Sequence, residues 1–509
     1  MVGRRFLTYV LACALAGCLG YDVWSLVGRV DARLNETVQA DWRKAGRMAS
    51  DGGSVAVLVN DADDLRPVER TRLLAVNWEL LPRVARCCSR SCLTNLTEDV
   101  VVASAFLGKK FETGLVGCGF VRGEECGSAC VWRRVCTSHG VENSLSAAMP
   151  WWREMLGVGL VCGLLICIFL WIMRWEGNWD TRRTLLLCLS FVVLSGITLT
   201  CGLLAPNGLG VYGGKAKLFF CTGGIPDGFW TNPEYAVYQP SYPPGLVAFA
   251  LLVDMLSGGC GDWLVQLLGP CALALLVAAI VGRRPSWIMV LATLSFAFSP
   301  WSVWLASEFY AEPFAALCLV CGWRKAWACG GRWAWLVVGC AGLFRHEGIA
   351  AAVLLWGMTR WFGIPTRARW GDLACVVSLP LAWQVFRFGV AAELPDFVFS
   401  RFLDVGTVVV MAKHAIVLIT RFWEAGGIVF LLLFAVVCGR KRTACIAGGA
   451  SVVFLVVACC ALAFNRTPHV AWLASNCVPR LIWIMFAVTL GSVTITSGRS
   501  PHQSRRLCF

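Results

Sequence analysis

The fold is organised around residues 207–245, which read NGLGVYGGKAKLFFCTGGIPDGFWTNPEYAVYQPSYPPG and lie between two apolar segments. Five aromatic residues between positions 229 and 242 argue against disorder in this stretch. Connections longer than about 12 to 15 residues are otherwise functional or disordered. We therefore expect a structured loop that takes part in function. The charged side chains of this loop are Lys215, Lys217, Asp227 and Glu234, in a chain that has few charged residues.

The composition places the chain among membrane proteins. Of its 509 residues, 58% are hydrophobic and only 15% are charged, and the mean hydropathy is +0.66. A soluble protein of this length needs more polar surface than that. The formal net charge of +14 comes from short Lys and Arg clusters between apolar runs, the pattern of cytoplasmic loops. We predict a polytopic protein that partners the lipid bilayer and binds no nucleic acid.

Successive apolar runs predict an all-α membrane body of about 12 transmembrane helices. The basic loops between these runs fall on one side if the N-terminus is cytoplasmic. Two left-over segments, 246–256 and 408–422, are expected to lie as helices at the outer interface. After the N-terminal region, we expect helices near residues 154–174, 183–204, 262–281, 286–302, 313–324, 332–345, 348–361, 371–388, 427–438, 444–464 and 481–496.

The first 150 residues are expected to form an anchor and an extramembrane domain. Residues 1–27 fit a retained first membrane helix, with a cleaved signal peptide as the alternative. Residues 28–150 predict a small mixed α/β domain, with a strand near Ser54–Val59 and helical spacing over Val68–Leu81. For its cysteines we favour disulfides over zinc binding, because the domain is external; they are Cys87, Cys88, Cys92, Cys118, Cys126, Cys130 and Cys136.

The remaining chain is expected to divide into three parts: residues 151–182 with a second transmembrane helix and a cytoplasmic loop, residues 183–496 as a transmembrane region with the external loop 205–245, and a cytoplasmic tail at 497–509.

Ionisable residues at membrane depth are costly in free energy and are typical of functional sites. The alternative is a set of separate interfacial charges that mark helix ends. This topology brings four polar stretches to the outer face: 207–245, Ser307–Glu312, Arg345–Gly348 and Asn465–Arg480.

Several motifs in the body resemble those of one enzyme family. They are Asn207-Gly-Leu-Gly-Val-Tyr-Gly-Gly-Lys215-Ala-Lys217, Asn232-Pro-Glu-Tyr, Tyr242-Pro-Pro-Gly, Ser299-Pro300 followed by Tyr310-Ala-Glu312-Pro, the Arg345-His346-Glu347-Gly348 turn, and Trp472 with Arg480. Over about residues 183–496 they resemble the bacterial GT-C glycosyltransferases, integral membrane enzymes that take sugars from polyprenyl phosphates. The resemblance implies a GT-C-like fold and an external active site.

The chain also departs from that family's pattern. Asn207 stands where the family usually carries an Asp. Gln239 and Ser241 stand where His and Asp are common, and Leu473 replaces a frequent His. An amide is not a useful proton acceptor, so another group must act as the base or activity has been lost. The candidate catalytic carboxylates are Glu312, Asp227, Glu234 and Glu308.

An inverting transfer from a lipid phosphate needs a carboxylate to deprotonate the acceptor hydroxyl and cations to stabilise the leaving phosphate. Glu312 is the first candidate for the base, because it lies in an apolar turn between helices. Its alternative role is to cap the next helix beside Pro313. Lys and Arg side chains are the phosphate candidates. The expected substrate-binding residues are Asn207, Lys215, Lys217, Tyr242, Arg345, His346, Glu347 and Arg480.

Two of these residues have structural alternatives. His346 fits a polar residue satisfied at a helix break, and Glu347 fits an ion pair with Arg345 or Lys215 that positions the loop. No cofactor is required by any motif. Glu308, Glu312 and Asp227 are the candidate ligands for a divalent metal, although no ligand spacing requires one.

The resemblance implies transfer of a hexose, mannose among the candidates, from a polyprenyl-phosphate-linked donor to a lipid or glycan acceptor. The expected place is the bacterial inner membrane, with the active face in the periplasm. Two alternatives stay open. One is the mannosyltransferase that adds the second mannose of GPI anchors in the endoplasmic reticulum, whose motifs are also similar. The other is a non-catalytic GT-C-like protein that binds or transports lipid-linked sugars.

Overall fold

The computed structural model describes part of the chain in detail. The described residues are 44–48, 55–59, 86–89, 100–104, 115, 120–126, 129–134, 181–201, 207–257 without 233, 234, 236 and 237, 262–281, 287–362 without 330, 369–390, 409, 453 and 470–493. The predicted anchor, the helix near 154–174, the two helices between 427 and 464, and the C-terminal tail lie outside these ranges.

The described chain is mostly helical, which confirms the all-α character of the body. Apolar residues dominate these helices, and short breaks rich in Gly, Pro or charge separate them. The helices are α6 Thr181–Cys201, η2 Asn207–Val211, α7 Gly213–Cys221, α8 Gly245–Ser257, α9 Asp262–Gln266, α10 Leu268–Val281, α11 Trp287–Ala297, α12 Pro300–Ser307, α13 Glu312–Cys329, α14 Arg332–Gly339, α15 Ala341–Phe344, α16 His346–Phe362, α17 Trp370–Val390 and α21 Val470–Val493.

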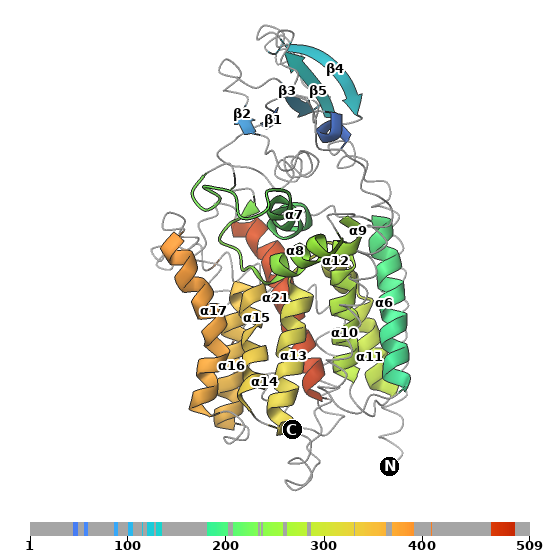
Figure 1. Ribbon diagram of the computed structural model, residues 1–509. Helices are drawn as coiled ribbons and strands as arrows, with labels where there is room; N and C mark the ends of the chain where they lie inside the picture. Colours follow the sequence, from blue (N-terminus) through green and yellow to red (C-terminus); the bar gives the residue numbers. More distant parts are fainter. Residues whose placement is uncertain are drawn as a thin grey trace.

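The longer helices run side by side as a bundle, with α7 and α8 at one end (Figure 1). Helix α13 is central: it packs against α10 and α14 and against α21, which comes from the far end of the sequence. Helix α14 in turn packs against α17, and α10 against α6. One buried apolar core runs through these contacts and includes Trp323, Trp335 and Trp483. The bundle therefore fixes segments that are distant in sequence.

Most predicted helices in the described part are present, but three of the predicted runs are broken. The run predicted over 332–345 breaks into α14 and α15, the run over 262–281 into α9 and α10, and the run over 286–302 into α11 and α12. Among the described residues, Trp263–Val281 is long and apolar enough to cross a bilayer, and the pair Met289–Ala297 and Trp301–Ser307, bent by 53°, would add a second span if counted as one. Buried helices of soluble proteins meet the same criterion, so the number of spans stays a prediction.

A five-stranded sheet precedes the helices and confirms a mixed domain near the N-terminus. Its order is β2-β1-β3-β5-β4, from β1 Val55–Val59, β2 Arg86–Ser89, β3 Val100–Ser104, β4 Phe120–Cys126 and β5 Ala129–Arg134. Strand β1 pairs in parallel with β2 and β3, whereas β5 pairs antiparallel with β3 and β4. The strand predicted near Val55 is thus present. The helix predicted over 68–81 and the cysteine side chains lie outside the description, so the disulfides stay a prediction.

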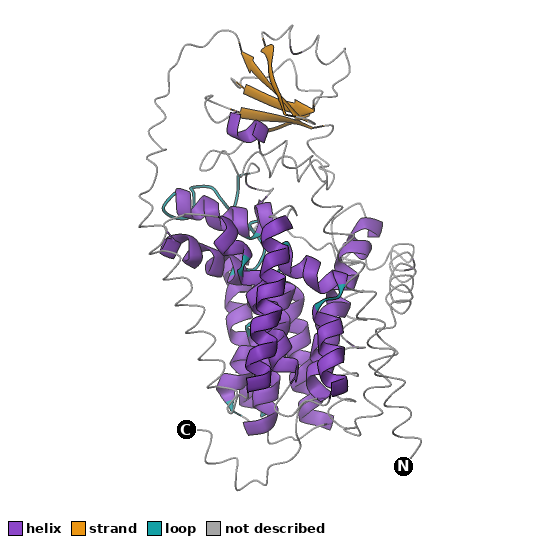
Figure 2. Ribbon diagram, turned by 90° about the vertical axis from the view of Figure 1, so that its right-hand side faces the viewer, coloured by secondary structure: helices purple, strands orange, loops and turns teal. Residues whose placement is uncertain are grey.

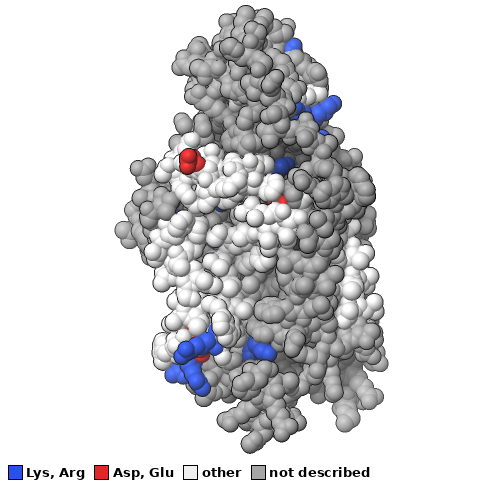
Figure 3. Space-filling view, viewed as in Figure 1, with Lys and Arg blue, Asp and Glu red and all other residues white. Residues whose placement is uncertain are grey.

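The sheet and the basic side chains mark opposite ends of the bundle. The sheet lies beyond α7 and α8 in both ribbon views (Figures 1 and 2). Lys and Arg side chains gather at the other end (Figure 3). Arg324 and Lys325 lie in the C-terminal half of α13, and Arg360 lies in the last turn of α16. The described basic residues of that far end are Arg324, Lys325, Arg332, Arg360 and Arg369.

Candidate functional site

The turn between α12 and α13 supplies a buried carboxylate. Ser299 caps α12, because its side chain accepts a hydrogen bond from the backbone N–H of Ser302, and Pro300 occupies the first turn. The turn itself contains Phe309 at a φ of +55°, a conformation that costs a bulky residue of order 1–3 kcal/mol. It delivers Glu312 to the first turn of α13 with its side chain fully buried. Glu312 thus stands beside Pro313 at the start of α13, but its carboxylate accepts no hydrogen bond from the described residues and so does not cap the helix.

Two guanidinium groups converge on the Glu312 carboxylate. Arg345 Nη1 and Arg480 Nη1 each lie 3.3 Å from Glu312 Oε1. These are ion-pair contacts without hydrogen-bond geometry, since neither carboxylate oxygen has a hydrogen-bond partner among the described residues. Arg345 Nη2 also donates to Glu347 Oε1 at 3.0 Å, and the Glu347 side chain is 25% exposed. The four side chains are formally neutral together.

A helix break places Arg345 in this cluster. Arg345 lies in extended conformation between α15 and α16, and its side chain is buried. Three residues further along the chain, a Cβ at Gly348 would collide with the carbonyl oxygen of Ala341, so the break accepts only glycine there. The packing of α15 against α16 thus fixes the backbone on both sides of Arg345.

Helix α21 positions Arg480 from the far end of the sequence. One turn beyond Arg480, the Trp483 indole donates to Ser302 Oγ at 2.7 Å and ties α21 to α12. The Arg480 guanidinium lies 5.0 Å from the ring centroid of Tyr310, a cation–π distance. Trp472, the other residue of the predicted motif, lies on α21 eight residues before Arg480, and its side chain is outside the description.

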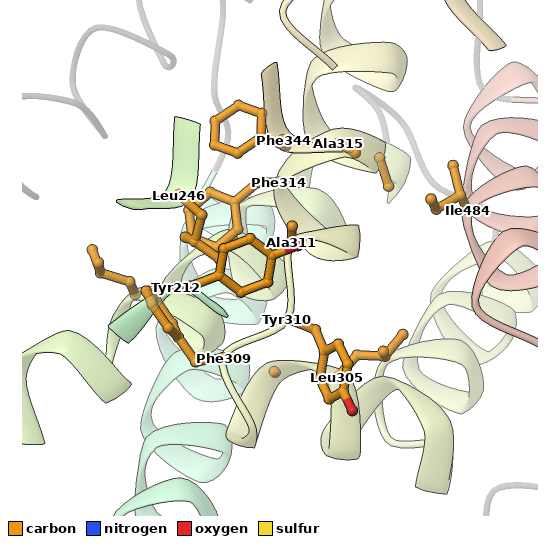
Figure 4. Packing of buried hydrophobic residues seen from close by; sticks show 14 of the residues in the cluster. Tyr212, Leu246, Leu305, Phe309, Tyr310, Ala311, Phe314, Ala315, Phe344 and Ile484 are labelled. Carbon is orange, nitrogen blue, oxygen red and sulfur yellow. The ribbon is translucent and has the colours of Figure 1, made fainter. Parts of the chain in front are cut away.

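The 207–245 loop closes over this cluster with aromatic rings. The Tyr212 ring contacts the rings of Tyr242 and Phe309 edge to face, with centroids 6.2 and 6.5 Å apart. Figure 4 shows Tyr212 and Phe309 beside Phe314 and Leu246 in this apolar shell. Burial raises the pKa of the Tyr212 phenol far above its ordinary range. The phenol therefore stays protonated and keeps its O–H as a hydrogen-bond donor.

Lys215 connects two distant parts of the 207–245 loop. Its ammonium Nζ donates to the Gln239 carbonyl oxygen at 2.9 Å and lies 6.0 Å from the Phe229 ring. Gln239 has a φ of +48°, a rare conformation for a residue with a side chain, and this lysine bond stabilises it. Where the loop ends, Gly245 approaches α15 closely, since a Cβ there would lie 2.7 Å from the Leu343 carbonyl oxygen.

Several polar atoms of the site are buried without a hydrogen-bond partner among the described residues. They are Tyr212 Oη, both Glu312 carboxylate oxygens, Arg345 Nε and Nη1, and His346 Nε2. An unsatisfied buried polar group costs about 1–3 kcal/mol, so a native protein tolerates several together where a ligand completes them. The donors among them suit an anion, and planar guanidinium groups suit phosphate oxygens.

The structure brings some of the predicted residues together and leaves others apart. Glu312, Arg345, Glu347 and Arg480 form the ion-paired cluster, and Tyr242 joins it through Tyr212 and through a ring contact with His346 at 5.7 Å. Glu308 is buried at the C-terminus of α12.

Four predicted residues of the loop are not placed in this cluster. Asp227 is exposed on the loop, whereas Glu312 is fully buried, so these two carboxylates do not share one ligand shell. The part of the chain that the structure describes holds no group of three His, Cys, Asp or Glu side chains that could bind a metal ion. Glu234 and the side chain of Asn207 lie outside the description, and Lys217 is half-buried on α7.

Tyr212 and Tyr310 belong to the site although their roles were not predicted. Both stand inside the motifs that suggested the site, and both contact its charged groups or its aromatic shell. A compositional signal was present in the sequence, because the chain has only 7 tyrosines and most of them lie between positions 212 and 310. Tyrosine combines an apolar ring with a polar tip, which suits the edge of a buried polar site.

Comparison with known proteins found no match to any protein-family model, curated protein or solved structure. A function for this chain is therefore inferred from the geometry of the site and from its sequence motifs.

Proposed function

We propose that the chain is a GT-C-like integral membrane glycosyltransferase. It would transfer a hexose from a polyprenyl-phosphate donor to a lipid or glycan acceptor at the outer face. The observation that carries this proposal is the meeting of Arg345 and Arg480 at the buried Glu312 carboxylate, beside the Tyr212 hydroxyl and the Arg345 Nε–H, which have no hydrogen-bond partner among the described residues. Two guanidinium groups and a protonated phenol can together bind the phosphate of such a donor.

The charge balance of the cluster suggests how Glu312 would act. The two carboxylates and two guanidinium groups have no net charge together. A bound phosphodiester would therefore bring the net charge of the site to −1. In the transfer, the acceptor oxygen attacks the anomeric carbon, and the bond from that carbon to the phosphate oxygen breaks with its electron pair going to the phosphate. The acceptor proton moves to Glu312, which removes one negative charge as the leaving phosphate gains one. Arg345 and Arg480 stabilise the phosphate that leaves.

The surface of the bundle supports a bilayer location. On α6, the side chains of Leu185, Leu189 and Val192 are exposed, and on α17 those of Leu381 and Val385 are exposed. Contiguous exposed apolar faces of this kind mark contact with lipid or protein. Reporter fusions at Thr222 and at Arg369 test the topology: opposite sides of the membrane are expected, with Arg369 cytoplasmic. The same side for both would contradict it.

Binding or transport of a lipid-linked sugar without transfer is a second candidate function. The observation that favours it is the engagement of the carboxylates: Glu312 is ion-paired with two arginines and Glu347 with one. For a carboxylate held in this way, positioning the cations is a sufficient role, and proton transfer is not required.

A transfer assay separates the two candidates. Purified protein in liposomes is given polyprenyl-phosphate-linked mannose or glucose together with membrane lipid extracts as acceptors. Sugar-bearing lipid or glycan product, absent with Glu312→Gln, supports the enzyme. Donor binding without product supports the non-catalytic candidate, and failure to bind any polyprenyl-phosphate ligand overturns both.

A further inference from the structure

An aromatic cluster lies beside the charged site and is built from two distant segments. Trp230 comes from the 207–245 loop, whereas Trp383 and Phe386 lie one turn apart on α17. The Trp230 ring centroid is 6.1 Å from that of Trp383 and 5.5 Å from that of Phe386, and the two α17 rings are 5.5 Å apart. Trp230 and Trp383 are half-buried. Partly exposed indoles offer flat faces to an apolar or sugar surface.

Two ring nitrogens at this cluster are buried without a hydrogen-bond partner among the described residues, Trp383 Nε1 and His346 Nε2. Gln384 settles the state of the imidazole. Its Oε1 accepts from Arg387 Nη1 at 3.5 Å, which leaves its Nε2 amide to donate to His346 Nδ1 at 3.0 Å. A neutral imidazole that accepts at Nδ1 carries its proton on Nε2. Both unpartnered nitrogens are thus N–H donors.

The aromatic cluster joins the charged site directly. His346 follows Arg345 in the chain, and its ring lies 5.7 Å from Tyr242, whose ring contacts Tyr212. Gln384, which donates to His346, follows Trp383 on α17, so a continuous set of contacts runs from Arg345 through His346 to the aromatic cluster.

We propose that Trp230, Trp383 and His346 form the binding subsite for the sugar ring of the lipid-linked donor. The C–H face of a pyranose would stack on the indoles, and its hydroxyl oxygens would accept hydrogen bonds from Trp383 Nε1 and His346 Nε2. This inference rests on the proposed function, since it takes the phosphate position from the charged cluster. It assigns recognition of the sugar to α17 and the loop, and recognition of the phosphate to Arg345 and Arg480.

Two ligands that differ only in the sugar test this division. Binding of farnesyl phosphate and of farnesyl-phosphoryl-mannose to the detergent-solubilised full chain is measured by calorimetry. Trp230→Ala is expected to weaken binding of the mannosylated ligand about tenfold and to leave farnesyl phosphate unchanged. Trp383→Phe keeps the ring but removes the N–H, and is expected to weaken only the mannosylated ligand, by a smaller factor. Trp333→Ala, at the far end of the bundle, is the matched control and should change neither affinity.

The outcomes separate the two proposals. Equal weakening of both ligands by Trp230→Ala, or no weakening of either, would overturn the sugar subsite while leaving the phosphate site in place. If wild-type protein binds neither ligand, the proposed function fails, and the subsite fails with it. Thermal unfolding of each variant shows whether a loss reflects the subsite or the fold, and Trp230→Phe should recover part of the lost affinity if stacking is the cause.

Discussion

The two ends of the helical bundle carry arginine in opposite settings. At the site end, Arg345 and Arg480 are buried, paired with carboxylates and covered by the 207–245 loop. At the far end, Arg332 and Arg369 are exposed, and Arg360 lies 5.9 Å from the ring of the exposed Trp370. Buried charges cost free energy unless they are paired or bind a ligand, whereas exposed ones cost little. The comparison supports the proposed site, because it lies at the end where burying charged side chains costs the most free energy.

Tryptophan makes the same contrast. At the far end, Trp333 and Trp361 are 78% and 67% exposed, next to basic residues. Exposed indoles with Lys and Arg are typical of the interface between a bilayer and water. At the site end, the Trp483 indole is fully buried and holds Ser302. In the proposed membrane location, the far-end tryptophans would anchor the bundle, whereas Trp483 positions a buried contact, and substitutions should separate the two roles.

The largest effect is expected from Glu312→Gln. If Glu312 is the general base, this substitution should lower turnover by roughly two to four orders of magnitude and leave donor affinity nearly unchanged. The variant also leaves two buried guanidinium groups without their shared carboxylate, which should cost about 3 to 5 kcal/mol of unfolding free energy. Farnesyl phosphate should restore part of the lost thermal stability, because its phosphate replaces the missing charge. Full turnover in this variant would exclude Glu312 as the base.

Should Asp227→Asn or Glu234→Gln abolish turnover while Glu312→Gln keeps it, the base lies in the loop. Asn207→Asp adds a matched comparison: higher activity is expected if the site has lost the carboxylate of the resembled family, and little change if Glu312 has taken over its role.

Tyr212→Phe should have a smaller effect. It should keep or raise the unfolding temperature but lower the affinity for the donor. The hydroxyl is buried without a partner among the described residues, so its removal should leave the unfolding temperature unchanged or raise it. Loss of a hydrogen bond to a charged phosphate should weaken donor binding by about 10- to 100-fold. Unfolding scans and calorimetry on the same samples give both values. A destabilised variant with unchanged affinity would mean that the hydroxyl serves the fold.

The smallest effects are expected at the far end. Arg332→Ala and Trp333→Ala change exposed side chains and should alter the unfolding free energy by less than about 0.5 kcal/mol and leave donor affinity unchanged. Thermal unfolding and donor titration check both values. A loss of donor binding in either variant would remove the contrast between the two ends.

The charged residues of the candidate site could be chosen from the sequence, whereas their partners could not. Apolar periodicity predicts the helices, and scarce polar residues between them point to Glu312, Arg345 and Arg480, because charge is rare in such a chain. Partner choice does not follow from spacing: Glu347 pairs with Arg345, whereas Lys215 donates to the Gln239 carbonyl. The role of Tyr212 depends on the positive φ of Phe309 and on the packing of the loop, which only the folded chain defines.

The most direct test of the account compares one arginine from each end. Binding of farnesyl phosphate to the purified full chain is measured by calorimetry for wild type, Arg480→Ala and Arg332→Ala, with thermal unfolding of each variant as the check on folding. We expect one phosphate-dependent site, whose affinity for farnesyl phosphate is at least about tenfold lower in Arg480→Ala and unchanged in Arg332→Ala. Equal affinity in a folded Arg480→Ala variant, or equal loss in both variants, would contradict it.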